Sequence, residues 1–280
     1  MRRRQPLKSN KLKKWLAAPY AVWAAGFIII PLILILYYAF TGEEGGFTLS
    51  NFAYVATKEN IKALGLALWL SLLSTALCLL LAYPLAMILA NRNVNQTSFI
   101  VLIFILPMWM NFLLRTLAWQ TLLEKNGVIN SILAFFHLPG ISIINTPGAI
   151  ILGMVYNFLP FMVLPLYNAL TKIDPNVINA AHDLGANWFQ TFLRVIFPLS
   201  LPGVISGITM VFVPALTTFV ISNLLGGSKI LLIGNVIEQE FTQASNWHLG
   251  SGLSIVLMVF ILINMLMTAI FDKNGEGTSL

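Results

Sequence analysis

Few residues in this chain belong to the types that catalyse reactions or bind metals, and those few are widely separated. There is one cysteine, Cys78, and there are three histidines, His137, His182 and His248. No two stand at metal-ligand spacing, and one cysteine cannot form an internal disulfide. The GxxxxGK(S/T), HExxH and GxSxG motifs are absent from the sequence. We therefore expect no catalytic residue, no metal site and no cofactor bound by this chain, and we interpret Cys78 as a small core residue.

One segment, 174–198, has local chemistry that predicts a defined structure. Asp174 is a good helix N-cap and Pro175 suits the first helical position. Gly185 is a natural residue for ending that helix in a left-handed conformation, and Asn187 can cap a second helix that leads toward Pro198. The first helix is short and amphipathic, and an exposed apolar face of this kind indicates a protein partner.

The composition places these segments in a membrane protein. Of the 280 residues, 58% are hydrophobic and 9% are charged, far below the roughly 25% charged residues of soluble domains. Long stretches without charge are each long enough for a spanning helix, and lipid requires helices because it offers the backbone no hydrogen-bond partner. The predicted fold class is an all-α integral membrane protein with six transmembrane helices, at about 16–40, 63–90, 98–123, 147–169, 200–224 and 249–271.

The predicted domains are a basic segment 1–14, a six-span domain 15–271 with a cytoplasmic loop 170–199, and a tail 272–280. The Arg and Lys residues crowded before the first span predict that both ends are cytoplasmic. Outside this cluster, the loops predicted to lie inside and those predicted to lie outside carry nearly equal numbers of Lys and Arg, so the cluster decides the orientation. We expect it to contact anionic membrane lipid and no nucleic acid. The apolar run after it is too long for a signal peptide. A short interfacial helix is expected in the outer loop at 130–138.

The loop also carries a family resemblance. Ala180-Ala181, Gly185 and then Val195-Ile196-Phe197-Pro198 resemble the Glu-Ala-Ala signature of bacterial ABC importer permeases, although Asn179 replaces the usual glutamate. The resemblance implies the type I ABC importer permease fold and a coupling helix that docks on an ATPase. The residues it assigns to ATPase coupling are Asn179, Ala180, Ala181, Asp183, Gly185, Arg194 and Pro198.

Further segments are similar to the spermidine/putrescine permeases of that family: Leu106–Trp109, Asn157–Tyr167, and Leu225–Lys229 with Leu232–Ile237. This resemblance implies a subunit that imports polyamines across the bacterial plasma membrane by alternating access. It implies as partners an ABC ATPase dimer that binds ATP-Mg, a second six-span permease and an extracytoplasmic substrate-binding protein. Related permeases import phosphonates, opines, thiamine or iron, so these substrates stay open.

A polyamine path would need aromatic rings for cation–π contacts and a few acceptor groups. The candidate path residues are Trp109, Tyr156, Phe161, Phe219, Asn223, Glu238, Glu240 and Trp247. Trp119 and Phe158 are further candidates. We expect Glu238 and Glu240, in the last outer loop, to guide cations into the mouth. Arg115 is interpreted as structural, either reaching the outer interface or pairing with one of these glutamates.

Two rival classes remain. A secondary carrier or channel would need no ATPase and gives no reason for the Ala-Ala…Gly pattern. A proton-coupled carrier is further disfavoured because the span centres lack acids. A membrane enzyme would need convergent polar residues at a membrane face, and the sequence offers none.

Overall fold

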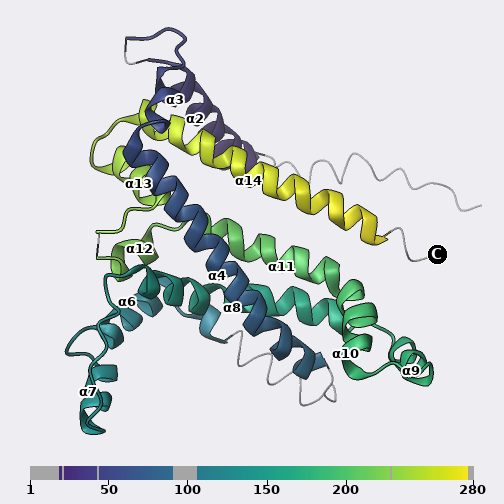
Figure 1. Ribbon diagram of the computed structural model, residues 1–280. Helices are drawn as coiled ribbons and strands as arrows, with labels where there is room; N and C mark the ends of the chain where they lie inside the picture. The colour runs from purple at the N-terminus through teal and green to yellow at the C-terminus, as the bar shows by residue number, and fades with distance from the viewer. Residues whose placement is uncertain (1–18, 21, 43, 91–105, 228, 277–280) are drawn as a thin grey trace, which may run out of the picture.

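The part of the chain that the structure describes is mainly helical. The structure, a computed structural model, describes residues 19–20, 22–42, 44–90, 106–227 and 229–276. The longer helices are α2 (Ile30–Phe40), α4 (Lys58–Ala90), α6 (Phe112–Leu123), α8 (Pro147–Leu170), α11 (Phe197–Thr217) and α14 (Trp247–Glu276). The shorter ones are α3 (Ser50–Val55), α7 (Val128–Phe135), α9 (Pro175–Asp183), α10 (Trp188–Thr191), α12 (Val220–Leu225) and α13 (Ile233–Thr242) (Figure 1). Among the described residues the only extended pairing is an isolated bridge between Thr41 and Phe47.

Five helical segments in the described part of the chain are long and apolar enough to cross a bilayer: Val22–Phe40, Lys58–Ala90, Pro147–Leu170, Trp188–Thr217 and Trp247–Ile270. The second begins at Lys58, before the predicted residue 63, and its 33 residues span about 50 Å at 1.5 Å per residue. It is therefore longer than the roughly 30 Å hydrocarbon core.

Two predicted spans differ from the structure. The third, 98–123, lies partly outside the described residues, and its described part has a break at Asn111. The Asn111 side chain caps α6 by accepting hydrogen bonds from the N–H groups of Leu113 (2.9 Å) and Leu114 (3.3 Å). The fifth, predicted at 200–224, ends at Thr217 and resumes as the short helix α12. The basic segment 1–14 lies outside the described residues, and α14 extends to Glu276, into the predicted tail.

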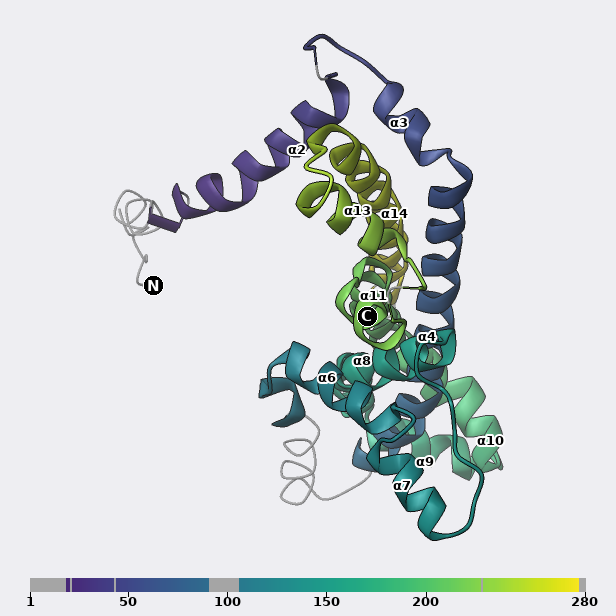
Figure 2. The same ribbon diagram turned by 90° about the vertical axis from the view of Figure 1, so that its left-hand side faces the viewer.

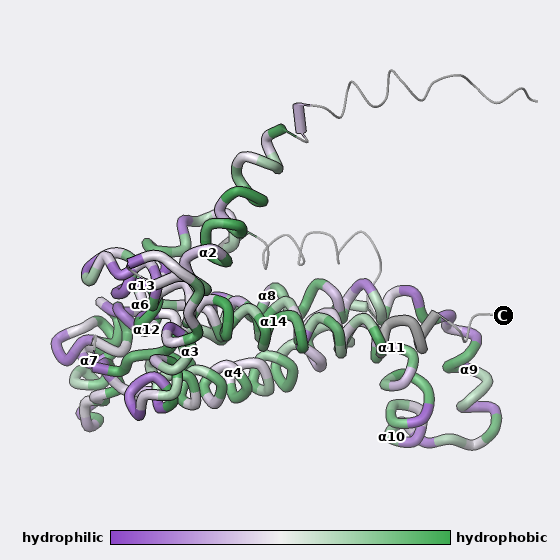
Figure 3. Tube along the Cα trace, turned by 90° about the horizontal axis from the view of Figure 1, so that it is seen from above, coloured by the Kyte–Doolittle hydropathy of each residue, from purple (hydrophilic) through white to green (hydrophobic). Residues whose placement is uncertain are grey.

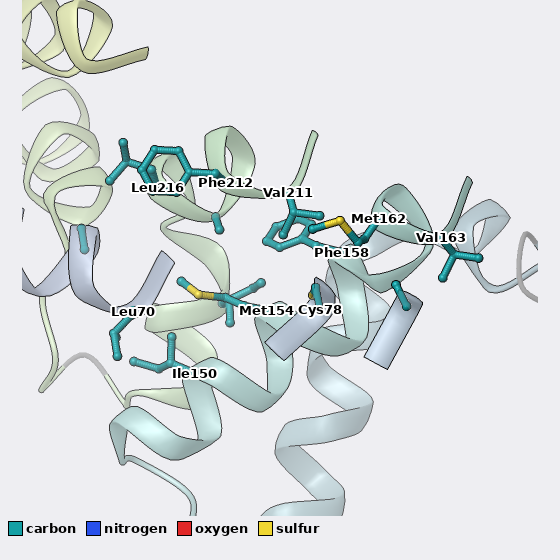
Figure 4. Close-up of a cluster of buried hydrophobic side chains, with 14 of the residues drawn as sticks. Leu70, Cys78, Ile150, Met154, Phe158, Met162, Val163, Val211, Phe212 and Leu216 are labelled. Carbon is teal, nitrogen blue, oxygen red and sulfur yellow. The ribbon is translucent and has the colours of Figure 1, made fainter. Parts of the chain in front are cut away.

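The core lies where α4, α8 and α11 pack against one another. Leu70, Cys78, Met154, Met162 and Val211 are at most 1% exposed and form part of one apolar cluster (Figure 4). Cys78 is therefore the buried core residue that its apolar surroundings predicted. Burial of this side-chain set fixes three of the spans against one another.

Two glycines allow α11 to approach α8 closely. A Cβ atom at Gly203 would lie 2.7 Å from the carbonyl oxygen of Pro165 and 2.5 Å from the Cβ of Ala169. At Gly207 it would lie 2.6 Å from the sulfur of Met162. The spacing of four residues puts both glycines on one helix face, the arrangement that lets membrane helices pack at short distance.

Two π turns stand directly before prolines. In the first, η1 (Ala25–Ile29), the N–H of Ile30 donates to the carbonyl of Ala25, one residue before Pro31. In the second, η3 (Phe192–Ile196), the N–H of Phe197 donates to the carbonyl of Phe192, one residue before Pro198. Proline lacks an N–H and crowds the carbonyl four residues earlier, and one wide turn accommodates it. The helix consequently runs without interruption through Pro198, and α10, η3 and α11 form one continuous rod.

The two ends of the bundle carry different elements. Helices α9 and α10 lie at one end, where α14 also finishes, whereas α3, α7, α12 and α13 gather at the other (Figures 1 and 3). The stretches between these ends are mainly hydrophobic (Figure 3). Viewed along the bundle, α2 and α6 project from the same side (Figure 2). The outer-loop helix predicted at 130–138 is α7, which spans Val128–Phe135.

Candidate coupling helix and substrate path

The segment that carries the resemblance folds as its local chemistry predicts. The Asp174 side chain accepts a hydrogen bond from the N–H of Asn176 (2.9 Å) and caps α9. Gly185 has a φ of 79°, and its N–H donates to the carbonyl of His182 (2.9 Å). The N–H of Ala186 donates to the carbonyl of Ala181 (3.0 Å). This pair of bonds is the Schellman end of a helix, for which glycine is preferred.

A capping box begins the second helix. The side chain of Asn187 accepts a hydrogen bond from the N–H of Gln190 (2.8 Å), and the Gln190 side chain accepts one from the N–H of Asn187 (3.0 Å). These reciprocal bonds satisfy two N–H groups at the start of α10. The turn between α9 and α10 is thus fixed at both sides, and α10 continues into the rod that ends at Thr217.

The turn presents an apolar surface outside the bundle. Leu184 is 89% exposed and Trp188 is 65% exposed, although soluble surfaces rarely gather such side chains without a partner. Most residues predicted to couple to an ATPase lie on α9 and its turn: Asn179, Ala180, Asp183 and Gly185 are exposed, and Ala181 is half-buried. Arg194 and Pro198 are also exposed but belong to η3 and α11.

Asn179 stands where the family signature has glutamate. It lines a cavity of about 460 Å³ between α9 and the ends of α4 and α8, together with His182, Trp188, Leu170 and Met87. An amide at this position can both donate and accept hydrogen bonds, whereas a carboxylate only accepts. The substitution therefore changes the chemistry of α9, which keeps its helical shape.

Of the predicted path residues, Phe219 and Glu238 come together. They line one cavity of about 350 Å³ with Thr217 and Gly234, where α11 ends and α13 begins. Phe219 is 39% exposed. The Glu238 carboxylate accepts a hydrogen bond from the hydroxyl of Thr242 (3.0 Å). This cavity joins an acidic group with an aromatic ring at an interrupted helix.

Glu240 and Trp247 lie in other surroundings. The hydroxyl of Tyr54, on α3, donates to the Glu240 carboxylate (3.1 Å). Burial, and then this carboxylate, raise the pKa of Tyr54, so the phenol remains a donor at neutral pH. Trp247 makes ring contacts with Tyr38 (6.0 Å between centroids) and Phe241 (5.5 Å).

The remaining path candidates are dispersed. Tyr156 contacts Trp119 edge to face, with 5.2 Å between the ring centroids. Phe161 is 36% exposed on α8, and Trp109 is 76% exposed in the 3₁₀ turn η2 (Leu106–Trp109). The structure thus divides the predicted set among several places along the bundle.

Asn235 is a positioning residue that the sequence reasoning missed. It is fully buried, and its side-chain oxygen accepts from the hydroxyl of Ser222 (2.5 Å) and the N–H of Leu232 (2.9 Å). Its amide donates to the carbonyl of Phe219 (3.1 Å) and to the side-chain oxygen of Asn223 (2.7 Å). These bonds tie α13 to the break before α12, and they place the predicted residue Asn223 in a structural network. No local pattern around Asn235 distinguishes it from a loop asparagine.

Arg115 is 7% exposed, so its side chain is buried among other residues of the chain. Its Nε has no hydrogen-bond partner within the described part of the chain. Both glutamates considered as its partners are engaged by other residues, Glu238 by Thr242 and Glu240 by Tyr54. The structure therefore does not show the pairing of Arg115 with Glu238 or Glu240 that the sequence suggested.

Comparison with known proteins agrees with these features. Residues 82–274 match the family described as "Binding-protein-dependent transport system inner membrane component". The chain is 39% identical over 267 residues to the spermidine/putrescine transport system permease protein PotB of Haemophilus influenzae, covering 91% of this chain and 92% of that one. It is 36% identical over 252 residues to PotB of Escherichia coli, covering 87% and 92%.

The fold also matches solved structures. A bacterial ABC transporter involved in the import of the acidic polysaccharide alginate matches with a TM-score of 0.80 at 19% identity, covering 95% of this chain and 96% of that chain. The likeness confirms the predicted all-α ABC importer permease fold. The matched residues make up more than half of the chain, which therefore belongs to the family of binding-protein-dependent transport system inner membrane components.

Proposed function

We propose that this chain is a permease subunit of an ATP-driven importer of polyamines such as spermidine and putrescine. The observation that carries the proposal is the 36–39% identity to polyamine permeases over about nine tenths of the chain. The cavity that joins Glu238 and Phe219 supports it, because a carboxylate and an aromatic face suit an organic cation. Phosphonate, opine, thiamine and iron transport have no comparable support.

The chain is a transport subunit, and ATP-Mg would be bound and hydrolysed by a partner ATPase dimer. The exposed apolar turn around Leu184 and Trp188 is a suitable docking surface for that partner. Movement of the turn would reach the transport path through the rod Trp188–Thr217. This rod is 30 residues long and extends about 45 Å. Its far end, at Thr217, borders the cavity that contains Glu238.

The remaining partners are assigned by position. A second six-span permease would pack on the side from which α2 and α6 project (Figure 2), since most of the apolar side chains of α2 are exposed. The end with α9 and α10 would face the cytoplasm with both termini. A substrate-binding protein would dock at the other end. One solved relative, the alginate transporter, is described in complex with a periplasmic protein.

The proposal is tested by uptake of labelled spermidine and putrescine into cells with and without the gene, at fixed membrane potential. We expect saturable uptake that deletion abolishes and that unlabelled polyamine competes away. Complementation with the gene should restore it. Unchanged polyamine uptake after deletion, in cells without a second polyamine importer, would contradict the proposed substrate and leave the family assignment standing.

A further inference from the structure

The break between α11 and α12 leaves unpaired backbone acceptors. α11 ends at Thr217, and Thr218 is extended, with a ψ of 136°. Within the described residues no N–H or hydroxyl donates to the carbonyl oxygens of Leu216, Thr217 or Thr218. The carbonyl end of a 21-residue helix also bears a partial negative charge. Free carbonyls at membrane depth are tolerated where they line a cavity.

The end of α11 borders the cavity that contains Glu238, because Thr217 is one of the lining residues. A Cβ at Gly234 would lie 2.7 Å from the carbonyl oxygen of Thr217 and 3.0 Å from that of Thr218, and Gly234 and Thr217 both line the cavity. The absence of a side chain at Gly234 therefore lets α13 begin directly against these oxygens. The cavity measures about 350 Å³, within the usual range of small-molecule sites.

The chemistry of the cavity wall selects one ligand class. The strongly polar groups near it are acceptors: the Glu238 carboxylate and the carbonyls at the end of α11. Phe219 adds a ring face, and no Lys or Arg is among its lining residues. The wall contributed by α14 is mainly aliphatic, with Leu257, Met258 and Ile261, and its one hydroxyl, on Ser254, donates to the carbonyl of Gly250. A group that fits is a primary ammonium on a methylene chain, with its charge at the acceptors and its chain along α14.

The two glutamates of α13 have different roles. Glu238 faces the cavity, whereas Glu240 accepts a hydrogen bond from Tyr54 on α3. Residues two apart on a helix point in different directions. We propose that the cavity at the α11–α12 break binds one ammonium group of the transported polyamine, with Glu238 as its counter-charge; this rests on the proposed function. Glu240 is the matched control, since it lies on the same helix with the same charge.

The test compares Glu238→Gln with Glu240→Gln in the complete transporter, reconstituted in liposomes with its ATPase, second permease and binding protein. The maximal rate of uptake of labelled spermidine and putrescine is measured beside ATP hydrolysis stimulated by the loaded binding protein. We expect Glu238→Gln to lower the maximal uptake rate at least tenfold and Glu240→Gln to lower it less than twofold. Immunoblots of the purified complex control for assembly. Phe219→Leu should lower the rate, and Phe219→Tyr should preserve it.

Each outcome has one meaning. Wild-type uptake of polyamine together with full activity of Glu238→Gln overturns the inference alone. Equal losses in both glutamine variants also overturn it, because they indicate a general field of negative charge at the mouth. If the wild-type transporter takes up neither polyamine, the proposed function fails and this inference fails with it.

Discussion

The close packing of α11 on α8 predicts different effects of alanine substitution at two glycines. Gly203 and Gly207 lie on the same face of α11, but an added methyl group would meet different neighbours. At Gly203 it would lie 2.7 Å from the backbone oxygen of Pro165 and 2.5 Å from the Cβ of Ala169. At Gly207 its nearest neighbour would be the sulfur of Met162, at 2.6 Å. A thioether can move by rotating about its side-chain bonds, whereas a backbone oxygen moves only with its helix.

The magnitudes follow from two opposing effects. Alanine favours a helix over glycine by about 0.5–1 kcal/mol. Overpacking a tight contact costs about 1–3 kcal/mol. For Gly203→Ala the full overpacking cost applies, and we expect a net loss of about 1–2 kcal/mol in the free energy of unfolding. For Gly207→Ala the sulfur gives way, and the two effects should nearly cancel.

Thermal stability of the two variants in detergent would measure this difference. The tagged protein is heated through a temperature series, and the fraction that remains monodisperse is recorded by size-exclusion chromatography. We expect the midpoint of Gly203→Ala to fall below those of wild type and Gly207→Ala, which should coincide. A Gly203→Ala midpoint equal to that of wild type, or below it only to the same extent as Gly207→Ala, would refute the packing argument.

Three further predictions follow from the site. Asn235→Ala removes four hydrogen bonds, two buried and two part-buried, and should cost about 3 kcal/mol or more. The same thermal assay should show a much smaller loss for Asn223→Ala, which removes one. Gly185→Ala puts a residue with a side chain into a left-handed backbone conformation at φ 79°, at a cost of about 1–2 kcal/mol. We expect it to reduce both substrate uptake and the binding of the ATPase measured in a pull-down assay. In a Cys78→Ala background, an impermeant thiol reagent should label Leu184→Cys only from the cytoplasmic face and Phe135→Cys only from outside. The reverse pattern would refute the assigned orientation, and labelling of both from one face would refute their placement at opposite ends of the bundle.

The coupling segment was predictable because its determinants are local. The caps at Asp174 and Asn187 and the left-handed turn at Gly185 depend on neighbours within a few residues. Each of these residues is polar or glycine at a position where an apolar residue would leave an N–H unpaired or strain the backbone. The amphipathic face of α9 followed from the same few residues.

The cavity at the end of α11 could not be predicted, because its determinants are distant in sequence. Hydropathy continues past Thr217, so nothing in the pattern marks the end of the helix there. The break is held by Asn235, which reaches back 16 residues to the carbonyl of Phe219. Glu238 was chosen as a candidate for its charge, and its role stays a prediction; its separation from Glu240 depends on Tyr54, 186 residues from Glu240. The break at Asn111 has a local signal, because asparagine is a good helix N-cap. The apolar residues on both sides of it led to the prediction of one unbroken span at 98–123.

The π turn at Phe192–Ile196 has a consequence for how related chains can differ in length. Such a turn holds one residue more than the α-helical ladder requires. Deleting one residue there would restore regular winding without breaking the helix. Because the turn already absorbs this extra residue, the segments on either side, including α9, would keep nearly the same orientation about the rod axis. Related chains can therefore gain or lose one residue at 192–196 while α9 keeps its orientation relative to the membrane-spanning part of the rod.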